Sequence, residues 1–343
     1  MILFSILYPI ILFFFTIFLL KLCIKLLPKF NLIDKPKKRS NHSDPIPRGG
    51  GLIVIPSIIF SIFFYIDNQL IDFYPWYTFC CIGLILFCIS FIDDIYNLPA
   101  VPRLFTQIIC ISFLVFYIDV DVKIFLDKIY FFLQVSDKSI IFDYTITFLL
   151  IILWLWIINL FNFMDGMDGI TFSQVCTFSI GIIILSLIGK IPEQYSYLGI
   201  LMFSSMLGFF FWNAPPAKIF LGDVGSIPLG FIIGSIIMIN LLKLENFIPL
   251  LTLILFHVMD ASLTLIKRIF KKKQIFKAHS DHFYQKKIRE GISHREVLTK
   301  INIINFSLIF LSLIYYKVGI SSFILSIFFI LISLYFLVQK KSQ

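Results

Sequence analysis

The chain has 343 residues, of which 59% are hydrophobic and 14% charged, and its formal net charge is +9. A soluble core of this length could not bury so much apolar surface, so the composition excludes a soluble globular protein. The apolar segments are continuous and do not alternate with polar residues, which excludes a transmembrane β-barrel. We therefore predict an all-α, polytopic membrane protein with one domain over residues 1–343.

A membrane-crossing helix needs roughly 20 apolar residues, and the sequence predicts about eleven of them. Their expected ranges are 2–24, 52–66, 75–92, 103–118, 144–161, 170–188, 195–212, 226–242, 247–266, 301–316 and 319–338. Lys and Arg concentrate in cytoplasmic loops, and 23 of the 29 fall on one side if the first loop is cytoplasmic. The N-terminus is then outside, the C-terminus cytoplasmic, and the first span a retained anchor of a multi-pass inner-membrane protein.

This topology assigns five loops to the cytoplasmic face, and all of the chemically interesting clusters lie in or beside them. These loops are residues 28–51, 93–103, 162–170, 213–226 and 267–300. Outside, the segment 119–143 mixes acidic and aromatic residues, which predicts a hairpin or an interfacial helix.

The first cytoplasmic loop ends in Arg48-Gly49-Gly50-Gly51, just before a predicted helix. Backbone N–H groups at a helix N-terminus can approach an anion closely, so this turn is a candidate phosphate-binding site with Arg48 beside it. The alternative is that the glycines only permit the turn into the helix.

Asp93 and Asp94 close the third predicted span. A helix C-terminus disfavours carboxylates, and two adjacent negative charges repel each other, so a metal ion or a cationic side chain must offset them. The alternative is a pair of solvated surface acids.

Asn159, Asn162, Asp165 and Asp168 repeat every three residues at the end of the fifth span. On a helix this spacing makes one stripe of polar groups, which are expensive to bury without partners. Helix capping would explain one of them, such as Asp168, but not the set.

Asp223 lies between Gly222 and Gly225 at the start of the eighth span. Ser226 can cap this helix, which would leave Asp223 free to bind a hard cation. Magnesium, or alternatively Mn²⁺, prefers oxygen ligands and uses one or two carboxylates together with substrate phosphates.

The last cytoplasmic loop carries His279, Asp281 and His282 among basic residues that include Arg268. The histidines are three residues apart and no Glu lies between them, which argues against a zinc-protease motif. They favour binding of a diphosphate or its neighbouring hydroxyls, whereas a lipid-facing basic loop is the alternative. We interpret His42 and His294 as ordinary loop histidines.

Together, these motifs resemble those of the polyprenyl-phosphate N-acetylhexosamine-1-phosphate transferases, the superfamily that contains the MraY and WecA enzymes and belongs to glycosyltransferase family 4. The matching segments, in the family's order, are 93–98 (DDIYNL), 159–169 (NLFNFMDGMDG), 220–226 (FLGDVGS) and 278–282 (AHSDH). The resemblance covers residues 1–300 and implies transfer of a sugar-1-phosphate from a UDP-amino sugar to undecaprenyl phosphate, with release of UMP and use of Mg²⁺.

The resemblance also implies roles for individual residues. The catalytic candidates are Asp93, Asp94, Asp165 and Asp168. The metal candidates are Asp223, Asp94 and Asp168. The substrate-binding candidates are Asn159, Asn162, Arg48, Arg268, His279, His282 and Ser226.

The histidine motif departs from one branch of the superfamily, because the peptidoglycan-type enzymes typically carry three consecutive histidines. Together with residues 39–51, it is similar to the WbpL-type subgroup, which starts O-antigen chains of lipopolysaccharide. That likeness implies UDP-GlcNAc or a 6-deoxy amino sugar, such as FucNAc or QuiNAc, as the donor.

Two other hypotheses remain open at this point. The first, within the same class, is a peptidoglycan-type phospho-MurNAc-pentapeptide transferase. The second is a nucleotide-sugar or anion transporter, which would place polar groups near the membrane midplane in inverted repeats that this sequence does not show. We expect membrane lipids and no nucleic acid among the partners, and a homodimer is compatible with the sequence.

Overall fold

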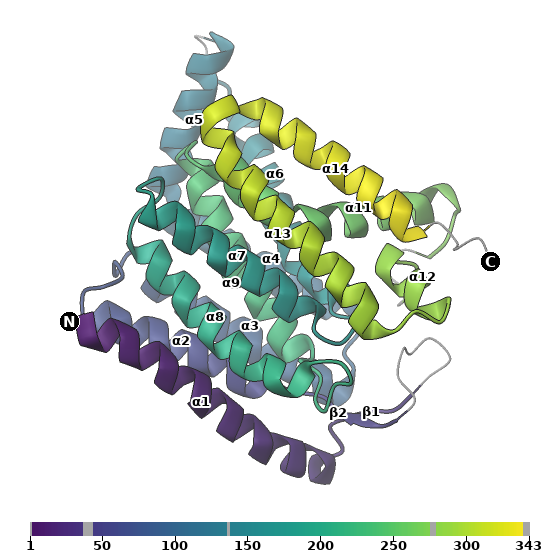
Figure 1. The fold of residues 1–343 in the computed structure, drawn as a ribbon. Coiled ribbons are helices and arrows are strands. Elements are labelled where there is room, and N and C mark those ends of the chain that lie inside the picture. Colours follow the sequence, from purple (N-terminus) through teal and green to yellow (C-terminus); the bar gives the residue numbers. More distant parts are fainter. Residues whose placement is uncertain (1, 37–43, 136–137, 275–278, 339–343) are drawn as a thin grey trace.

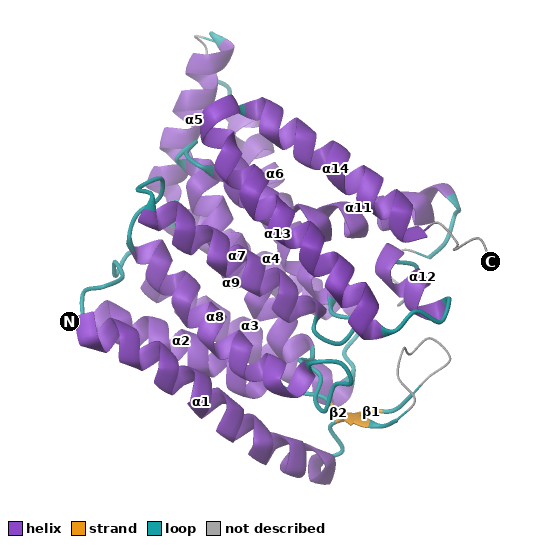
Figure 2. Cartoon of the chain, viewed as in Figure 1, coloured by secondary structure: helices purple, strands orange, loops and turns teal. Residues whose placement is uncertain are grey.

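In the computed structural model, residues 2–36, 44–135, 138–274 and 279–338 are described, and they form an almost entirely helical bundle (Figure 2). Nine of the described helices are long and apolar enough to cross a membrane. They are α1 (Ile2–Leu26), α3 (Trp76–Tyr96), α4 (Ala100–Tyr117), α6 (Ile140–Met164), α7 (Ile170–Leu187), α8 (Gln194–Asn213), α9 (Asp223–Leu242), α13 (His294–Val318) and α14 (Ile320–Val338). The prediction of an all-α polytopic membrane protein is confirmed.

Two of the eleven predicted spans differ from a simple crossing helix. The second is α2 (Gly51–Asp67), a shorter apolar helix of 17 residues. The ninth is broken into α10 (Phe247–Leu253) and α11 (Leu255–Phe270), which are bent by 73°. The break frees the carbonyl group of Leu253, and the buried side chain of Gln174 in α7 donates a hydrogen bond to it at 2.8 Å.

Helix α9 is the centre of the bundle. Within its most apolar 18-residue segment 94% is buried, whereas the corresponding value for the N-terminal helix is 22%. It packs against α2, α3 and α6, and the rings of Trp154 in α6 and Phe231 in α9 stack with centroids 6.1 Å apart. Helices α1 and α14 lie on the outside of the bundle (Figure 1). The residues that begin and end α9 are therefore held by several neighbouring helices.

The short elements cluster at the two ends of the bundle (Figure 1). One end carries η1 (Leu27–Phe30), the antiparallel pair β1 (Ile33–Asp34) and β2 (Ile46–Pro47), and α12 (Phe283–Arg289). The opposite end carries α5 (Asp119–Leu133), so the first part of the predicted outside segment is a helix rather than a hairpin. Helix α1 begins at the end that carries α5, and α14 finishes at the end that carries α12. Which end faces the cytoplasm stays a prediction of the Lys and Arg distribution.

Candidate active site

A cluster of three carboxylates and two arginines joins four separate parts of the chain. Arg103, in the first turn of α4, contacts Asp93 at 2.6 Å and Asp223 at 2.9 Å. Arg48, just before α2, contacts Asp94 at 2.8 Å and forms a second ion pair with Asp223. We call these five residues the arginine–aspartate cluster.

The alternative of two solvated surface acids at the end of α3 is wrong. Asp93 is only 5% exposed, and 2% of the Asp94 side chain is exposed. Arg48 and Arg103 supply the positive charge that buried carboxylates require. Burial lowers the pKa of Arg48, but Asp223 and Asp94 raise it above its ordinary value, so the guanidinium stays charged.

Asp94 also caps the central helix. Its two carboxylate oxygens accept the backbone N–H groups of Asp223 at 3.1 Å and of Val224 at 3.0 Å. A carboxylate is stabilised by the dipole of a helix N-terminus, which offsets its unfavourable position at the C-terminus of α3. The expectation that Ser226 caps α9 is wrong, because its hydroxyl is buried and accepts a hydrogen bond from Asn162 at 3.1 Å.

The glycine turn before α2 does not present its N–H groups to an anion. Gly49 and Gly50 donate to the carbonyl of Phe220 at 3.0 and 2.8 Å, and Gly51 donates to that of Leu221 at 2.9 Å. A Cβ at Gly51 would lie 2.3 Å from the backbone nitrogen of Gly225. The glycines thus allow close contact between the two loops, and the prediction of a backbone phosphate site here is wrong.

The four polar residues at the end of α6 diverge, because the helix ends at Met164. Asn159 lies one turn deeper than Asn162 and donates to Gln107 at 2.7 Å. Asp165 accepts from the hydroxyl of Thr171 at 2.6 Å. Asp168 accepts from the backbone of Ala217 at 3.1 Å. The prediction of one continuous stripe is therefore wrong beyond Asn162.

Asp165 and Asp168 differ in their electrostatic surroundings. Burial raises the pKa of Asp165 to about 7, while the Thr171 hydroxyl and the charge of Arg48 act in the opposite direction. The carboxylate of Asp168 lies 3.1 Å from Nδ1 of His294, at the start of α13. Our interpretation of His294 as an ordinary loop histidine is therefore wrong.

The histidine loop is held by its own ion pairs. Arg268 is 7% exposed, pairs with Asp281 and donates to the carbonyl of Gln274 at 2.5 Å. Burial raises the pKa of Asp281, but hydrogen bonds from Arg268 and Lys273 keep it below its usual value. In this structure Arg268 therefore holds the loop in place. We had expected it to contact the substrate.

The two histidines of the loop lie side by side. His282 is 3% exposed and its Nδ1 lies 2.9 Å from the carboxylate of Asp260, so the lipid-facing alternative is wrong for this residue. The ring of His279 stacks on that of His282, with centroids 5.2 Å apart. Burial and the neighbouring His282 lower the pKa of His279 to about 4. At pH 7 His279 is therefore neutral and can act as a hydrogen-bonding group but not as a cation.

The histidine loop and the end of α6 are in direct contact. Tyr284 in α12 donates its hydroxyl to the carbonyl of Met164 at 3.1 Å, next to Asp165. The residues His42, Lys277 and Ala278 lie outside the described part of the chain.

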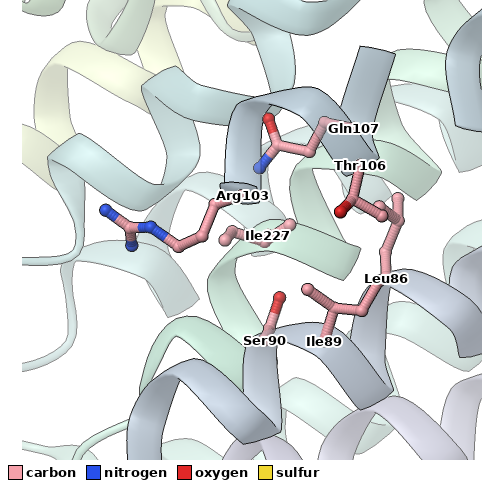
Figure 3. Close-up of a pocket in the computed structure, with 7 residues that line it drawn as sticks. All are labelled: Leu86, Ile89, Ser90, Arg103, Thr106, Gln107 and Ile227. Carbon is pink, nitrogen blue, oxygen red and sulfur yellow. The ribbon is translucent and has the colours of Figure 1, made fainter. Parts of the chain in front are cut away.

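A narrow hollow between α3 and α4 adjoins the arginine–aspartate cluster. Figure 3 shows the residues that line it, Thr106 and Gln107 of α4, Leu86, Ile89 and Ser90 of α3 and Ile227 of α9, with the guanidinium of Arg103 pointing away from Leu86 and Ile89. The walls are largely apolar, whereas Arg103 places a positive charge beside them.

Three residues of the site were missed by our sequence reasoning. Arg103 counted only toward the topology, His294 was set aside, and Asp260 was not singled out. Asp260 did carry a signal, because a carboxylate within an apolar span is expensive unless it has partners. Arg103 and His294 carried none, since single basic residues near helix ends are common.

The donor set of the cluster fits a hard cation by its chemistry. Asp94 and Asp223 offer carboxylate oxygens, which are the ligands that a hard cation prefers. Among the described residues, no group of three His, Cys, Asp or Glu side chains is already arranged to hold a metal ion. Asp168, the third predicted ligand, contacts Ala217 and His294 instead.

The fold and the site define a polytopic membrane protein with a cluster of buried ion pairs at one end of its bundle. Residues 76–241, from α3 to α9, match the profile of the glycosyl transferase family 4. This segment contains Asp93, Asp94, Arg103 and Asp223.

Similar proteins were found in several bacteria. A probable undecaprenyl-phosphate N-acetylglucosaminyl 1-phosphate transferase of Bacillus subtilis is 26% identical, over 81% of this chain and 75% of its own. A phospho-N-acetylmuramoyl-pentapeptide-transferase of Buchnera aphidicola is 28% identical, over 86% of this chain and 87% of its own. A decaprenyl-phosphate N-acetylglucosaminephosphotransferase of Mycobacterium leprae is 26% identical, over 79% of this chain and 73% of its own. The family match and these relatives confirm the resemblance to the polyprenyl-phosphate N-acetylhexosamine-1-phosphate transferases that the motifs indicated.

Proposed function

We propose that this protein transfers N-acetylhexosamine-1-phosphate from a UDP-amino sugar to undecaprenyl phosphate and releases UMP. The observation that carries the proposal is the arginine–aspartate cluster, in which Arg48 and Arg103 meet Asp93, Asp94 and Asp223 at one end of an apolar bundle. Transfer between two anionic substrates depends mainly on positioning and on neutralising charge. Positioning the substrates and neutralising their charge both need cationic groups that are held rigidly at the membrane edge.

We assign the two substrates to different sides of the site. Arg103 lies beside the apolar walls formed by Leu86, Ile89 and Ile227, which suits the phosphate and first isoprene units of a lipid acceptor. A soluble nucleotide sugar arrives from water, on the side of the loop that carries His279 and His282. Asp165, whose pKa of about 7 matches the working range of a general base, lies between these regions and can accept a proton.

Magnesium, or alternatively Mn²⁺, is proposed as the cofactor. Asp223 and Asp94 would hold it, and the ion would add positive charge at the transferred phosphate. Both carboxylates form ion pairs with Arg48, and Asp223 also pairs with Arg103. With the ion bound, the guanidinium of Arg48 would be available to the substrate phosphates, which it can bind in a bidentate manner.

The finer proposal is that the product starts an O-antigen or another cell-envelope glycan. Residues 279–282 read His-Ser-Asp-His, not three consecutive histidines, which favours GlcNAc or a 6-deoxy amino sugar such as FucNAc or QuiNAc over the MurNAc-pentapeptide. The relatives at 26–28% identity include enzymes named for both kinds of donor. We further propose that the enzyme resides in the inner membrane, with the cluster on the cytoplasmic face.

The test is an assay of UMP release by the purified protein with undecaprenyl phosphate, Mg²⁺ and a panel of UDP-sugars. We expect UMP with UDP-GlcNAc or a UDP-6-deoxy amino sugar, and none with UDP-MurNAc-pentapeptide. Release with the pentapeptide donor alone would assign the peptidoglycan reaction. Absence of UMP with every donor, together with uptake of nucleotide sugar into proteoliposomes, would replace the proposal with a transporter.

A further inference from the structure

Asp260 is a fully buried carboxylate within the bent helix pair that has no place in the arginine–aspartate cluster. It lies in α11, is 0% exposed, and accepts a hydrogen bond from the hydroxyl of Thr264 at 3.2 Å. Its other partners all come from the histidine loop, 22 to 24 residues further along the chain. A carboxylate at such a depth is retained only when these partners satisfy it.

The contact with His282 fixes the tautomer of that histidine. Nδ1 of His282 lies 2.9 Å from Oδ1 of Asp260, and a carboxylate oxygen only accepts hydrogen bonds. Nδ1 must therefore carry a proton, which leaves Nε2 as the variable position. Within the described residues no hydrogen bond engages Nε2. The ring is held between those of His279 and Tyr284, at centroid distances of 5.2 and 5.8 Å.

The same carboxylate sets the start of α12. The backbone N–H of Phe283 donates to both oxygens at 3.2 and 3.1 Å, and that of Tyr284 donates to Oδ2 at 3.4 Å. Tyr284 in turn reaches the carbonyl of Met164 at 3.1 Å, one residue before Asp165. One buried side chain thus determines both the orientation of His282 and the contact between α12 and the end of α6.

We propose that Asp260 is a positioning residue, which holds Nε2 of His282 toward the sugar diphosphate of the bound donor. This inference rests on the proposed function. The donor is favoured over the lipid acceptor because the histidine loop lies outside the apolar spans, whereas the hollow beside Arg103 lies between α3 and α4. Asp260 acts through His282 and does not itself contact the substrate.

The first test measures the tautomer directly and needs no activity. In the protein with ¹⁵N-labelled histidine, solid-state NMR should show His282 protonated at Nδ1, with His282→Ala used to assign the signal. In Asp260→Asn the amide can donate to Nδ1, so the proton should move to Nε2, as when an amide replaces the carboxylate of a catalytic triad. The same tautomer in both proteins would overturn the proposal.

The second test is a double-mutant cycle on UMP release. Asp260→Asn should lower kcat/KM for the donor by about 10²-fold or more, with KM for undecaprenyl phosphate unchanged. Because Asp260 acts through His282, the double variant Asp260→Asn/His282→Ala should be no worse than His282→Ala alone. Additive losses would show a merely structural role and overturn the proposal.

The matched control is Thr264→Val, which removes the hydrogen bond from the Thr264 hydroxyl to Asp260 and nearly keeps the volume of the side chain. It should retain activity within a few-fold. Where Asp260→Asn fails to fold, Asp260→Glu is the second variant, and it should recover part of the activity lost in Asp260→Ala. If the wild-type protein releases no UMP, the proposed function fails, whereas the NMR result still decides the relation between Asp260 and His282.

Discussion

The carboxylate of Asp94 accepts the backbone N–H of Asp223 at 3.1 Å, although 129 residues separate them along the chain. The end of α3 is thereby joined to the start of α9, and both residues share Arg48 as a counter-ion. Asp223 is also linked to Asp93 through Arg103. A change of charge at any one of these positions should therefore affect the others.

Asp94→Asn and Asp223→Asn test the cluster most simply. Each substitution keeps the shape of the side chain but removes a negative charge that faces Arg48. We expect each to reduce UMP release by at least about 10²-fold, while the protein remains folded in the membrane. Near-wild-type turnover by both variants would remove the proposed role of the carboxylates.

Arg103→Gln should act on the acceptor side. The substitution leaves Asp93 buried without its cation and removes the positive charge beside the apolar hollow. We expect a rise of about tenfold or more in KM for undecaprenyl phosphate, with a smaller change in KM for the donor. Arg295→Gln, at an exposed position, is the matched control and should behave as wild type. An effect on the donor alone would contradict this division of roles.

Gly51→Ala tests the close contact between the loops around residues 48–51 and 220–225. The added Cβ would lie 2.3 Å from the backbone nitrogen of Gly225, so the backbone must move. We expect destabilisation of about 1–3 kcal/mol or more, measured by thermal unfolding in detergent. In Gly83→Ala the new Cβ would meet side chains alone, the end of Ile59 at 3.3 Å and the ring of Phe231 at 3.7 Å, and the loss should be smaller. Equal stability of the two variants would argue against the tight contact.

Asp165 should give the protein a pH-dependent stability. Its pKa in the folded state, about 7, lies above the ordinary value of 3.8, so the folded state favours the protonated form. The resulting contribution is full below about pH 4 and is lost as the pH rises through 7. The difference in Tm between wild type and Asp165→Asn should therefore change over this window. A difference that is constant between pH 4 and 8 would contradict the raised pKa.

His279→Ala should impair handling of the donor without preventing membrane insertion. Because the pKa of His279 is about 4, its side chain is neutral at physiological pH. The loss in kcat/KM for the UDP-sugar should therefore be the same at pH 6 and pH 8. Unchanged kinetics would remove His279 from the site, and a loss confined to pH 6 would show that the cationic form is needed.

Much of this arrangement could be predicted from sequence because the apolar segments are long and their ends carry the polar residues. The alternation of spans placed Asp94 and Asp223 at the same end, and the structure joins them directly. The unfavourable position of two carboxylates at a helix C-terminus also indicated that a cationic partner was needed. These inferences depended only on element type and direction.

The remaining features depend on three-dimensional contacts that no spacing rule contains. Asp94 rather than Ser226 caps α9, because the end of α3 reaches the start of that helix. At the 73° break near Leu253, the carbonyl group of Leu253 is satisfied by Gln174 from another helix. His282 is buried because Asp260, outside its motif, binds it. In each case the deciding partner lies on a different segment of the chain.

The most direct test of the central claim uses a UDP-amino sugar that carries ³²P on the phosphate attached to the sugar. The purified protein, given Mg²⁺ and undecaprenyl phosphate, should move the label into the lipid product and release unlabelled UMP, and Asp223→Asn should not. Release of labelled UDP together with an unlabelled lipid-linked sugar would mean that the sugar moves without its phosphate. That result would contradict the proposed transfer of sugar-1-phosphate.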